Sequence, residues 1–370
     1  MPGMPCRALL LAVLLAGCSA VAAAAPPLSH LQVPPGFHVS IYSDQVPNAR
    51  EITLGTGDTV FVGSMREGKV YALTGRDPNG RARHVYVVAK ELEMPVGVAF
   101  HDGALYVSAV SKILKYPDIE AHLADPPKPV VVTDKLPSKT HHGWRFIAFS
   151  PDGKLYVPIG APCNICEPGP EFAKIIRMNP DGSDWQTVAT GIRNTVGFDW
   201  QPGTHALWFT NNGRDLMGDN VPDDTLNRVD KPGENFGYPY CHAGNVIDPE
   251  FGRGHSCSDF AQPALRLGAH VASLGMRFYV GQMFLASYRG TIFIAEHGSW
   301  NRSSKSGYRV VVVHVGKDGK VTGSKPFLAG FLDGQKPLGQ PADVQPLRDG
   351  SLLVSDDANG VIYRITYNAK

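Results

Sequence analysis

The sequence has no excess of charge of either sign. Its 35 lysines and arginines nearly balance its 34 aspartates and glutamates, and charged residues make up only 19% of the chain. A protein that binds nucleic acid through the phosphate backbone needs a basic surface. The composition therefore gives no electrostatic reason to expect a nucleic-acid partner.

Amphipathic helices are also scarce. Beyond the first twenty residues, apolar side chains seldom recur with helical spacing, whereas the chain contains 40 glycines and 30 prolines. Both residues interrupt helices and are frequent in tight turns. The composition argues against a helical protein and favours many short strands joined by turns.

The N-terminus lacks an apolar run long enough for a lasting transmembrane anchor. Arg7 precedes the apolar stretch 8–16, which has the length of a signal-peptide core. We therefore interpret residues 1–25 as a signal with a short tether and residues 26–370 as the mature domain. The mature protein is expected to be exported, to the periplasm of a bacterium.

Two cleavage sites remain open. The stretch 15–18, Leu-Ala-Gly-Cys, resembles the lipobox of bacterial lipoproteins, in which the cysteine carries the acyl chains after cleavage. This interpretation predicts lipidation at Cys18 and contact with a membrane only through that anchor. Ordinary cleavage in the alanine-rich stretch 20–25 is the alternative.

The sequence has only six cysteines, and the expected export determines the chemical state predicted for each of them. Cys6 leaves with the signal, and Cys18 is either lipidated or lost. The remaining cysteines are Cys163, Cys166, Cys241 and Cys257. An even number in an oxidising compartment indicates two disulfides, and among the three connectivities we expect neighbours to pair.

The Cys-x-x-Cys pair at 163–166 has other chemical uses. A haem attachment site needs histidine next, but Glu167 follows. A zinc site needs a second ligand pair, and the sequence offers none nearby. A redox-active pair is a further alternative, but the even count in an exported chain favours structural disulfides.

One pattern recurs along the chain: a glycine-containing turn, a run of alternating apolar and aromatic residues, and a second turn. Its six copies occupy residues 57–65, 102–110, 152–160, 204–212, 289–297 and 349–357. Glycine before such runs indicates hairpins, because it accepts the positive φ of tight turns. Repeats about 45 to 60 residues apart, with one wider gap, are typical of propeller blades of four strands. We predict a single all-β, six-bladed β-propeller, with a two-sheet sandwich as the alternative.

Apolar runs between the copies, such as 69–73 and 309–315, are expected to be the outer strand of one blade or the start of the next. The wide gap, at about 232–275, is rich in glycine, proline and histidine. It predicts a long loop insertion on one face, pinned by a disulfide between Cys241 and Cys257.

Polar residues that suit a binding site gather in the stretch 190–240. A Gly-x-Arg-Asn loop containing Arg193 leads into a strand-like run, and an acidic pair, Asp223 and Asp224, follows. Arginine offers a fixed fork of donors that suits a planar, oxygen-rich anion. The alternative is a structural arginine that satisfies loop carbonyls.

Three motifs in this stretch give the chain a family resemblance. They are R-N-x-x-G-F from Arg193, D-D-x-x-N from Asp223 and G-x-N-F-G-Y-P from Gly233, in that order. Together they resemble the soluble glucose/sorbosone dehydrogenases, quinoproteins that use pyrroloquinoline quinone (PQQ). The resemblance covers most of the chain from about residue 31 onward.

The resemblance implies the catalytic residues. In the family, a histidine four residues before an arginine and ahead of a D-G-K-L-Y strand is the catalytic base, which selects His141 over His142 here. Histidine suits this task because its ordinary pKa lies near neutrality. Arg193 is implied to polarise the reactive quinone carbonyl, where negative charge grows during hydride transfer. Asn194 is implied to hydrogen-bond the cofactor.

The resemblance also implies calcium. Relatives hold this ion near the segment equivalent to Gly213, Arg214 and Asp224, through backbone carbonyls and waters. This chain has Gly-Arg where the relatives have Gly-Pro, so a second cation lies close to the expected ion. Asp224 either supports the ion or braces a turn.

Two further cofactor contacts are expected. The family places a basic residue in the region of 297–302, where Arg302 is the expected equivalent and His297 and Lys305 are the rivals. Where glucose-oxidising relatives present arginines to the quinone carboxylates, this chain has Gln340, which can hydrogen-bond but brings no charge.

These features predict an exported PQQ-dependent dehydrogenase that oxidises a sugar or sugar aldehyde and passes electrons to an external acceptor. Two alternatives belong to other classes. A calcium-dependent lactone or ester hydrolase would need an axial cage of carboxylates and amides, for which only Asp223 and Asp224 form a cluster. A membrane-tethered binding propeller without catalysis is the other alternative.

Overall fold

The computed structural model describes residues 28–316 and 318–368. The predicted signal and lipobox, with Cys6 and Cys18, lie outside the described residues. Within these ranges the helices are short 3₁₀ turns, and none is long and apolar enough to cross a membrane. They are Leu28–His30, Ile119–Ala121, Cys257–Asp259 and Ala286–Tyr288.

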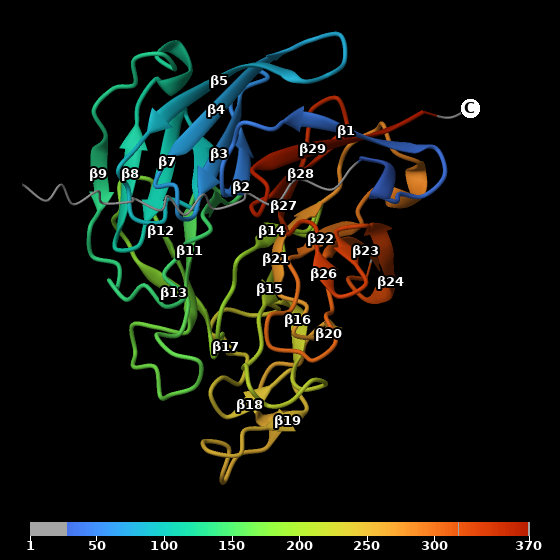
Figure 1. The fold of residues 1–370 in the computed structure, drawn as a ribbon. Coiled ribbons are helices and arrows are strands. Elements are labelled where there is room, and N and C mark those ends of the chain that lie inside the picture. The colour runs from blue at the N-terminus through green and yellow to red at the C-terminus, as the bar shows by residue number, and fades with distance from the viewer. Residues whose placement is uncertain (1–27, 317, 369–370) are drawn as a thin grey trace, which may run out of the picture.

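Strands form six blades that follow one another along the chain (Figure 1). Blade 1 consists of β2 (Ala49–Leu54), β3 (Val60–Ser64), β4 (Val70–Arg76) and β5 (Ala82–Ala89). Blade 2 consists of β6 (Val98–His101), β7 (Ala104–Ala109), β8 (Lys112–Tyr116) and β9 (Val130–Thr133). Blade 3 consists of β10 (Ala148–Phe149), β11 (Leu155–Ile159), β12 (Lys174–Met178), β13 (Gln186–Thr190) and a parallel fifth strand, β17 (Glu234–Asn235).

The second half of the ring is built in the same way. Blade 4 consists of β14 (Phe198–Trp200), β15 (Leu207–Asn211), β16 (Asp223–Arg228) and β20 (Leu265–Ala269). Blade 5 consists of β21 (Ser273–Phe278), β22 (Ile292–Glu296), β23 (Arg309–Val315) and β24 (Val321–Leu328). Blade 6 consists of β27 (Pro341–Pro346), β28 (Leu352–Asp356), β29 (Val361–Tyr367) and β1 (Phe37–Ser43). The predicted six-bladed propeller is confirmed.

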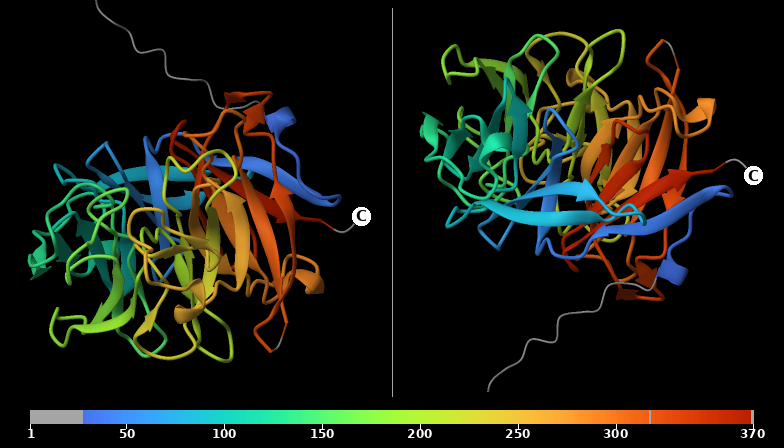
Figure 2. Two further views of the ribbon diagram at one scale, coloured as in Figure 1. Left: turned by 90° about the horizontal axis from the view of Figure 1, so that it is seen from below. Right: turned by 90° about the horizontal axis from the view of Figure 1, so that it is seen from above.

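The ring is closed by strands from both ends of the described chain. β1 pairs antiparallel with β29, with Phe37 opposite Tyr367, so the N-terminal strand completes the last blade. Figure 2 shows the blades arranged in chain order around a central region, with the blue β1 beside the red β29. The backbone hydrogen bonds of this closure lie within blade 6, where β1 covers the edge of β29 that would otherwise be exposed.

The hydrophobic core lies between neighbouring blades. The second strands are almost wholly buried, because each sheet packs on both faces. Six clusters of buried side chains fill the interfaces between adjacent blades; representative pairs are Phe61 with Leu105, Ala99 with Ile147, Phe146 with Phe209, Trp208 with Ile294, Phe293 with Val354, and Val60 with Leu353. Each interface buries side chains from two adjacent sheets in the same way, which explains the repeated apolar pattern of the sequence.

All six predicted repeats form the second strand of a blade, namely β3, β7, β11, β15, β22 and β28. The expectation for the runs between them was wrong. Residues 69–73 and 309–315 belong to β4 and β23, which are third strands rather than outer or first strands. The outer strands are more polar, because their exposed face meets water, and they escape a search for apolar runs.

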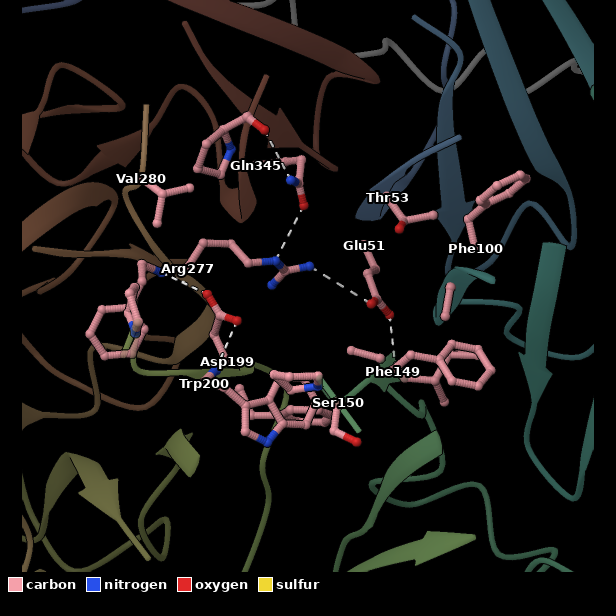
Figure 3. A pocket seen from close by; sticks show the side chains of 18 residues that line it. Glu51, Thr53, Phe100, Phe149, Ser150, Asp199, Trp200, Arg277, Val280 and Gln345 are labelled. Carbon is pink, nitrogen blue, oxygen red and sulfur yellow. Dashed lines mark hydrogen bonds and ion pairs between the residues drawn. The ribbon is translucent and has the colours of Figure 1, made fainter. Parts of the chain in front are cut away.

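Carboxylates on the innermost strands tie the blades together at one end of the axis; Figure 3 shows two of them, Glu51 and Asp199. Their oxygens accept backbone N–H groups from other blades: Glu51 from Val98 and Ile147, Asp199 from Phe278, and Asp343 from Ile52. Burial raises the pKa of Asp343 to about 6 and that of Glu51 well above its ordinary value.

One arginine lies among these acids. The Arg277 guanidinium contacts Asp343 at 3.4 Å, lies 3.9 Å from Glu51 and donates from Nε to Gln345 at 3.2 Å. Glu51, Arg277 and Gln345 line a cavity of about 440 Å³, as does Asp199. Because their polar atoms already bond one another or the backbone, we assign this end of the axis a structural role.

The predicted insertion leaves blade 4 between its third and fourth strands. Residues 229–264 contain β17, the ribbon β18 (Cys241–His242) and β19 (Val246–Ile247), and a 3₁₀ turn, and they project from one side of the ring (Figure 1). Cys241 is bonded to Cys257 within the insertion, and Cys163 is bonded to Cys166. The disulfides therefore join the neighbouring cysteines, as expected. A second short ribbon, β25 (Leu332–Asp333) with β26 (Lys336–Pro337), precedes blade 6.

Candidate active site

A polar pocket of about 330 Å³ lies at the opposite end of the innermost strands, where those strands begin. Segments that enter several blades contribute to it, because the inner strands converge on the axis. Its lining includes Arg50, His141, His142, Trp144, Arg193, Asn194, Asn212, Asp215, Asp224, His270, His297, Trp300, Asn301 and Gln340. Six residues that the sequence analysis named as site candidates line this one pocket: His141, Arg193, Asn194, Gly213, Asp224 and Gln340. Their roles stay predictions.

Arg193 is held rigidly at the floor of this pocket. The loop before β14 can turn because Gly191 has φ 66°, and an added Cβ there would lie 1.9 Å from Asn235 Oδ1. The side chain of Arg193 is buried. Its Nε donates to Asn164 O at 2.9 Å, Nη1 to Asn212 O at 3.4 Å, and Nη2 to Asn164 Oδ1 at 2.8 Å and Asp215 Oδ2 at 2.7 Å.

These contacts use four of the five guanidinium N–H groups. One Nη1 N–H therefore has no partner among the residues that the structure describes. It can donate to a ligand in the pocket. The structural role of Arg193 and a ligand-binding role are compatible, since the same fork serves both.

The two neighbouring histidines lie in different environments. The His141 ring is exposed at the pocket, whereas His142 is only 6% exposed. Their ring centroids lie 4.1 Å apart. Partial burial and then the positive charge of Arg193 lower the pKa of His141, so its ring is a neutral acceptor at neutral pH.

His142 has a fixed tautomer. Its Nδ1 lies 2.8 Å from Ala161 O, and because a carbonyl only accepts, Nδ1 carries the proton. Burial, followed by the charge of Arg193, holds the pKa of His142 well below its ordinary value. The ring packs beside Gly160, where an added Cβ would lie 2.6 Å from His142 Cβ. Both histidines therefore offer a neutral ring nitrogen as an acceptor. The activity of variants at each position separates their roles.

A second cluster of polar and charged side chains in the pocket wall forms from three segments that lie far apart in the sequence. Arg50 Nε lies 2.7 Å from Asp357, and His297 Nε2 lies 2.9 Å from the same carboxylate. Burial opposes ionisation of Asp357, but Arg50 and His297 together lower its pKa. Gln340 Nε2 lies 3.4 Å from His297 Nδ1. This part of the wall can meet an anion with a guanidinium, an imidazole and a carboxamide.

The structure places His297, rather than Arg302, on the pocket wall. Arg302 donates to Ser304 O and Ala269 O at 2.9 and 3.2 Å and is not among the lining residues; nor is Lys305. Arg302 thus supports the loop that carries Trp300, whose side chain is 68% exposed.

The segment expected to hold calcium is tightly hydrogen-bonded. Asp224 is buried, and its oxygens accept the N–H of Gly213 at 2.8 Å and of Ser273 at 3.3 Å. Burial raises the pKa of Asp224 to about 6. The guanidinium of Arg214 pairs instead with Asp248 and Glu250 of the insertion. Asp224 braces this turn, and Arg214 anchors the insertion beside the pocket.

The described residues contain no group of three or more His, Cys, Asp or Glu side chains that could hold a metal ion. Asp224 can supply one carboxylate oxygen to a cation. Backbone carbonyls, water or a cofactor would have to supply the remaining ligands, and Ca²⁺ accepts such oxygen ligands.

The donor set fits a planar, polar anion. Besides the open N–H of Arg193, the side-chain amide of Asn194 makes no hydrogen bond in the described structure and can donate. Asn301 Oδ1 is buried without a described partner, and as an acceptor it suits a hydroxyl group of a ligand. Trp144 and Trp300 offer flat apolar surfaces. A volume of about 330 Å³ lies within the range of small-molecule sites.

Sequence reasoning missed several pocket residues, notably Arg50, Asp215, Trp300 and Asn301. A signal for Arg50 exists, since it stands at the start of an innermost strand, as the pocket residues of other blades do. Asp357 and Asn164 carry no comparable local signal.

A six-bladed propeller with a polar axial pocket, in which a neutral histidine lies near a buried arginine, defines a small-molecule site. The family model for glucose/sorbosone dehydrogenase matches residues 121–364. The chain belongs to this family. An uncharacterised protein of Borreliella burgdorferi is 34% identical over 353 residues, which cover 92% of this chain and 91% of that protein.

Solved structures share the fold. A Trichoderma reesei protein of carbohydrate-active enzyme family AA12 has a TM-score of 0.80 and 21% identity, covering 93% of this chain and 98% of its own. The PQQ domain of Coprinopsis cinerea pyranose dehydrogenase has a TM-score of 0.75 and 20% identity, covering 91% and 97%. The PQQ-bound aldose sugar dehydrogenase of Streptomyces coelicolor has a TM-score of 0.62 and 17% identity, covering 91% and 100%.

Proposed function

We propose that the protein is an exported, PQQ-dependent dehydrogenase that oxidises a sugar or sugar aldehyde and delivers electrons to an external acceptor. The observation that carries this proposal is that His141 and Arg193 line one axial pocket in a chain of the glucose/sorbosone dehydrogenase family. The pocket residues supply an acceptor for a hydroxyl proton and a donor for a growing negative charge.

Bound PQQ would supply an electrophilic quinone that accepts a hydride equivalent. Arg193 and Asn194 would hold its quinone edge, since both have donors open to the pocket. Arg50, His297 and Gln340 would meet its carboxylates. Because the Asp357 carboxylate pairs with Arg50 and contacts His297, we expect affinity to depend strongly on hydrogen bonds as well as on charge.

His141 is proposed as the general base. Its ring is accessible from the pocket and neutral at neutral pH, so it can take the hydroxyl proton of a bound sugar as the C–H bond is broken. Arg193 stabilises negative charge at the floor of the pocket, and its fixed partners keep it in place throughout the reaction. Trp300, exposed on the pocket wall, offers an apolar face to the sugar ring.

The decisive experiment is reconstitution. The purified protein, stripped with EDTA, is supplied with PQQ and Ca²⁺ and assayed for dye reduction against a panel of aldoses and sugar aldehydes. Saturable reduction that requires PQQ supports the proposal. Tight binding of PQQ without reduction by any sugar would favour a binding propeller, and ester or lactone cleavage without PQQ would favour a hydrolase.

Calcium is proposed as a second cofactor, with Asp224 as its carboxylate ligand beside the Gly213–Arg214 backbone. EDTA-treated protein with PQQ should therefore be inactive and recover on addition of Ca²⁺. Asp224→Asn removes a negative charge while keeping an acceptor for Gly213 N–H, so recovery should need about tenfold more Ca²⁺. Titration of activity against free Ca²⁺ measures this. Full activity in EDTA would refute the role of calcium.

The pH dependence follows from His141. A general base acts only when neutral, so kcat/KM should be high above its pKa and fall as pH falls through it. Because burial and Arg193 lower this pKa, the acidic limb should be centred below the ordinary value of 6.5. Arg193→Met, assayed with PQQ at saturation, should move the limb to higher pH, since a positive charge is removed. An acidic limb that does not move would show that another group is titrating.

Export and anchoring complete the proposal. Two disulfides are compatible with an oxidising compartment outside the cytoplasm. We propose that residues 1–25 direct export, that the domain of residues 26–370 acts in the periplasm, and that Cys18 carries a lipid anchor if the lipobox is cleaved.

A further inference from the structure

Asn164 lies in the short loop between the disulfide-bonded Cys163 and Cys166, and it connects two residues of the pocket. Its backbone O and its Oδ1 accept Arg193 Nε and Nη2 at 2.9 and 2.8 Å. The same Oδ1 accepts Asp215 N at 2.9 Å, and Nδ2 donates to Asp215 O at 3.1 Å. Asn164 thus binds both members of the Arg193–Asp215 ion pair.

The loop itself is held from two sides. The disulfide closes it, and Tyr238 from the insertion reaches it through its hydroxyl, which accepts Cys166 N at 3.1 Å and lies 3.5 Å from Asn164 O. The backbone N–H of Tyr238 donates to Gly191 O at 3.0 Å, in the same loop that carries Arg193. Tyr238 therefore joins the disulfide loop to the arginine loop.

A buried arginine side chain with several rotatable bonds needs such support to point in one direction. Asp215 contributes charge but only one contact, at 2.7 Å. Asn164 contributes two contacts at different nitrogens, which fix both the plane and the rotation of the guanidinium. We propose that Asn164, kept in place by the Cys163–Cys166 disulfide, is a positioning residue that aims the open N–H of Arg193 into the pocket. The catalytic consequence rests on the proposed function; the positional claim does not.

The positional claim is tested on protein without cofactor. Arginine is labelled with ¹⁵N, and the Nη2–H signals of Arg193, which donate to Asn164 Oδ1, are assigned by their loss in Arg193→Lys. In the native protein these protons should exchange slowly with water. Asn164→Ala removes their acceptor and Cys163→Ser/Cys166→Ser loosens the loop that holds it, so each variant should raise the exchange rate about tenfold or more. An unchanged rate in Asn164→Ala overturns the proposal.

Activity of the reconstituted enzyme gives the second measurement. Asn164→Ala should lower kcat about 10- to 100-fold, while KM for the sugar stays within about twofold, because Arg193 is misaimed rather than removed. Asn164→Asp retains the acceptor for Nη2 and should recover most of both kcat and exchange protection. Asn79→Ala changes an exposed turn asparagine and should leave both measurements as in the native protein.

The second disulfide is the matched control for the first. Cys241→Ser/Cys257→Ser breaks a bond inside the insertion whose cysteines do not line the pocket. This variant should leave the hydrogen-exchange rate of the Arg193 guanidinium unaltered. If both cysteine pairs raise that rate equally, the loop contributes only to general stability, and the proposal is overturned. If the native protein proves inactive with PQQ while Asn164→Ala still frees Arg193, the proposed function fails but the positioning role stands.

Discussion

Turnover of the His141→Ala variant should fall by about 10²- to 10⁴-fold, the range that a positioned general base contributes. The ring of His141 is exposed on the pocket, so its removal opens no buried cavity and should leave the melting temperature almost unchanged. Binding of PQQ, followed by quenching of tryptophan fluorescence, should also change little, since the other proposed cofactor contacts remain.

Two variants control this prediction. His84→Ala removes an exposed histidine from the outer strand of blade 1 and should be fully active. His142→Asn removes the second ring nitrogen in the pocket but suits the backbone, because His142 has φ 50° and asparagine tolerates that conformation. Its amide can also donate to Ala161 O. If His142→Asn abolishes turnover and His141→Ala does not, His142 is the base.

Arg193→Ala should lower kcat by about 10²- to 10³-fold and weaken PQQ binding as well, because one guanidinium holds the quinone edge and stabilises the growing charge. Unlike the histidine variant, it should also be less stable, by up to about 3 kcal/mol, since Asp215 loses its partner in a partly buried site. Steady-state kinetics, fluorescence titration with PQQ and thermal unfolding measure the three effects.

Stability and catalysis can be separated in this case. Arg193→Met/Asp215→Asn removes the unpaired carboxylate and should recover much of the stability but none of the turnover. Arg289→Ala, at an exposed arginine on blade 5, should match the native protein in all three measurements. Native kcat in a folded Arg193→Ala variant would show that electrostatic stabilisation comes from elsewhere.

The sequence predicted the architecture because the information is local. Each second strand is buried on both faces between blades, so it appears as an apolar run after a glycine turn, and six such runs imply six blades. The disulfide pairing was also accessible, because short separations leave few alternatives. The third strands were misassigned because an apolar run shows that a strand is buried but does not show its position within the blade.

His141 and Arg193 were named as a catalytic pair from the family resemblance, and both line one pocket. Other parts of the site depend on long-range contacts that no motif reports. Arg50, His297 and Asp357 come from blades 1, 5 and 6 and meet only because the ring closes. The choice of His297 over Arg302 depends on which side of one loop faces the axis.

By itself, the sequence determined the blade count, the disulfide framework and the residues with suitable chemistry. Only the tertiary structure decided which of these residues share a pocket and what holds them there. Asn164 shows the difference: between two cysteines it looks like part of a structural loop, yet it makes two contacts with Arg193. Local strand patterns come from burial of neighbouring residues, whereas a site forms where loops from separate blades converge, and the closure of the propeller sets that convergence.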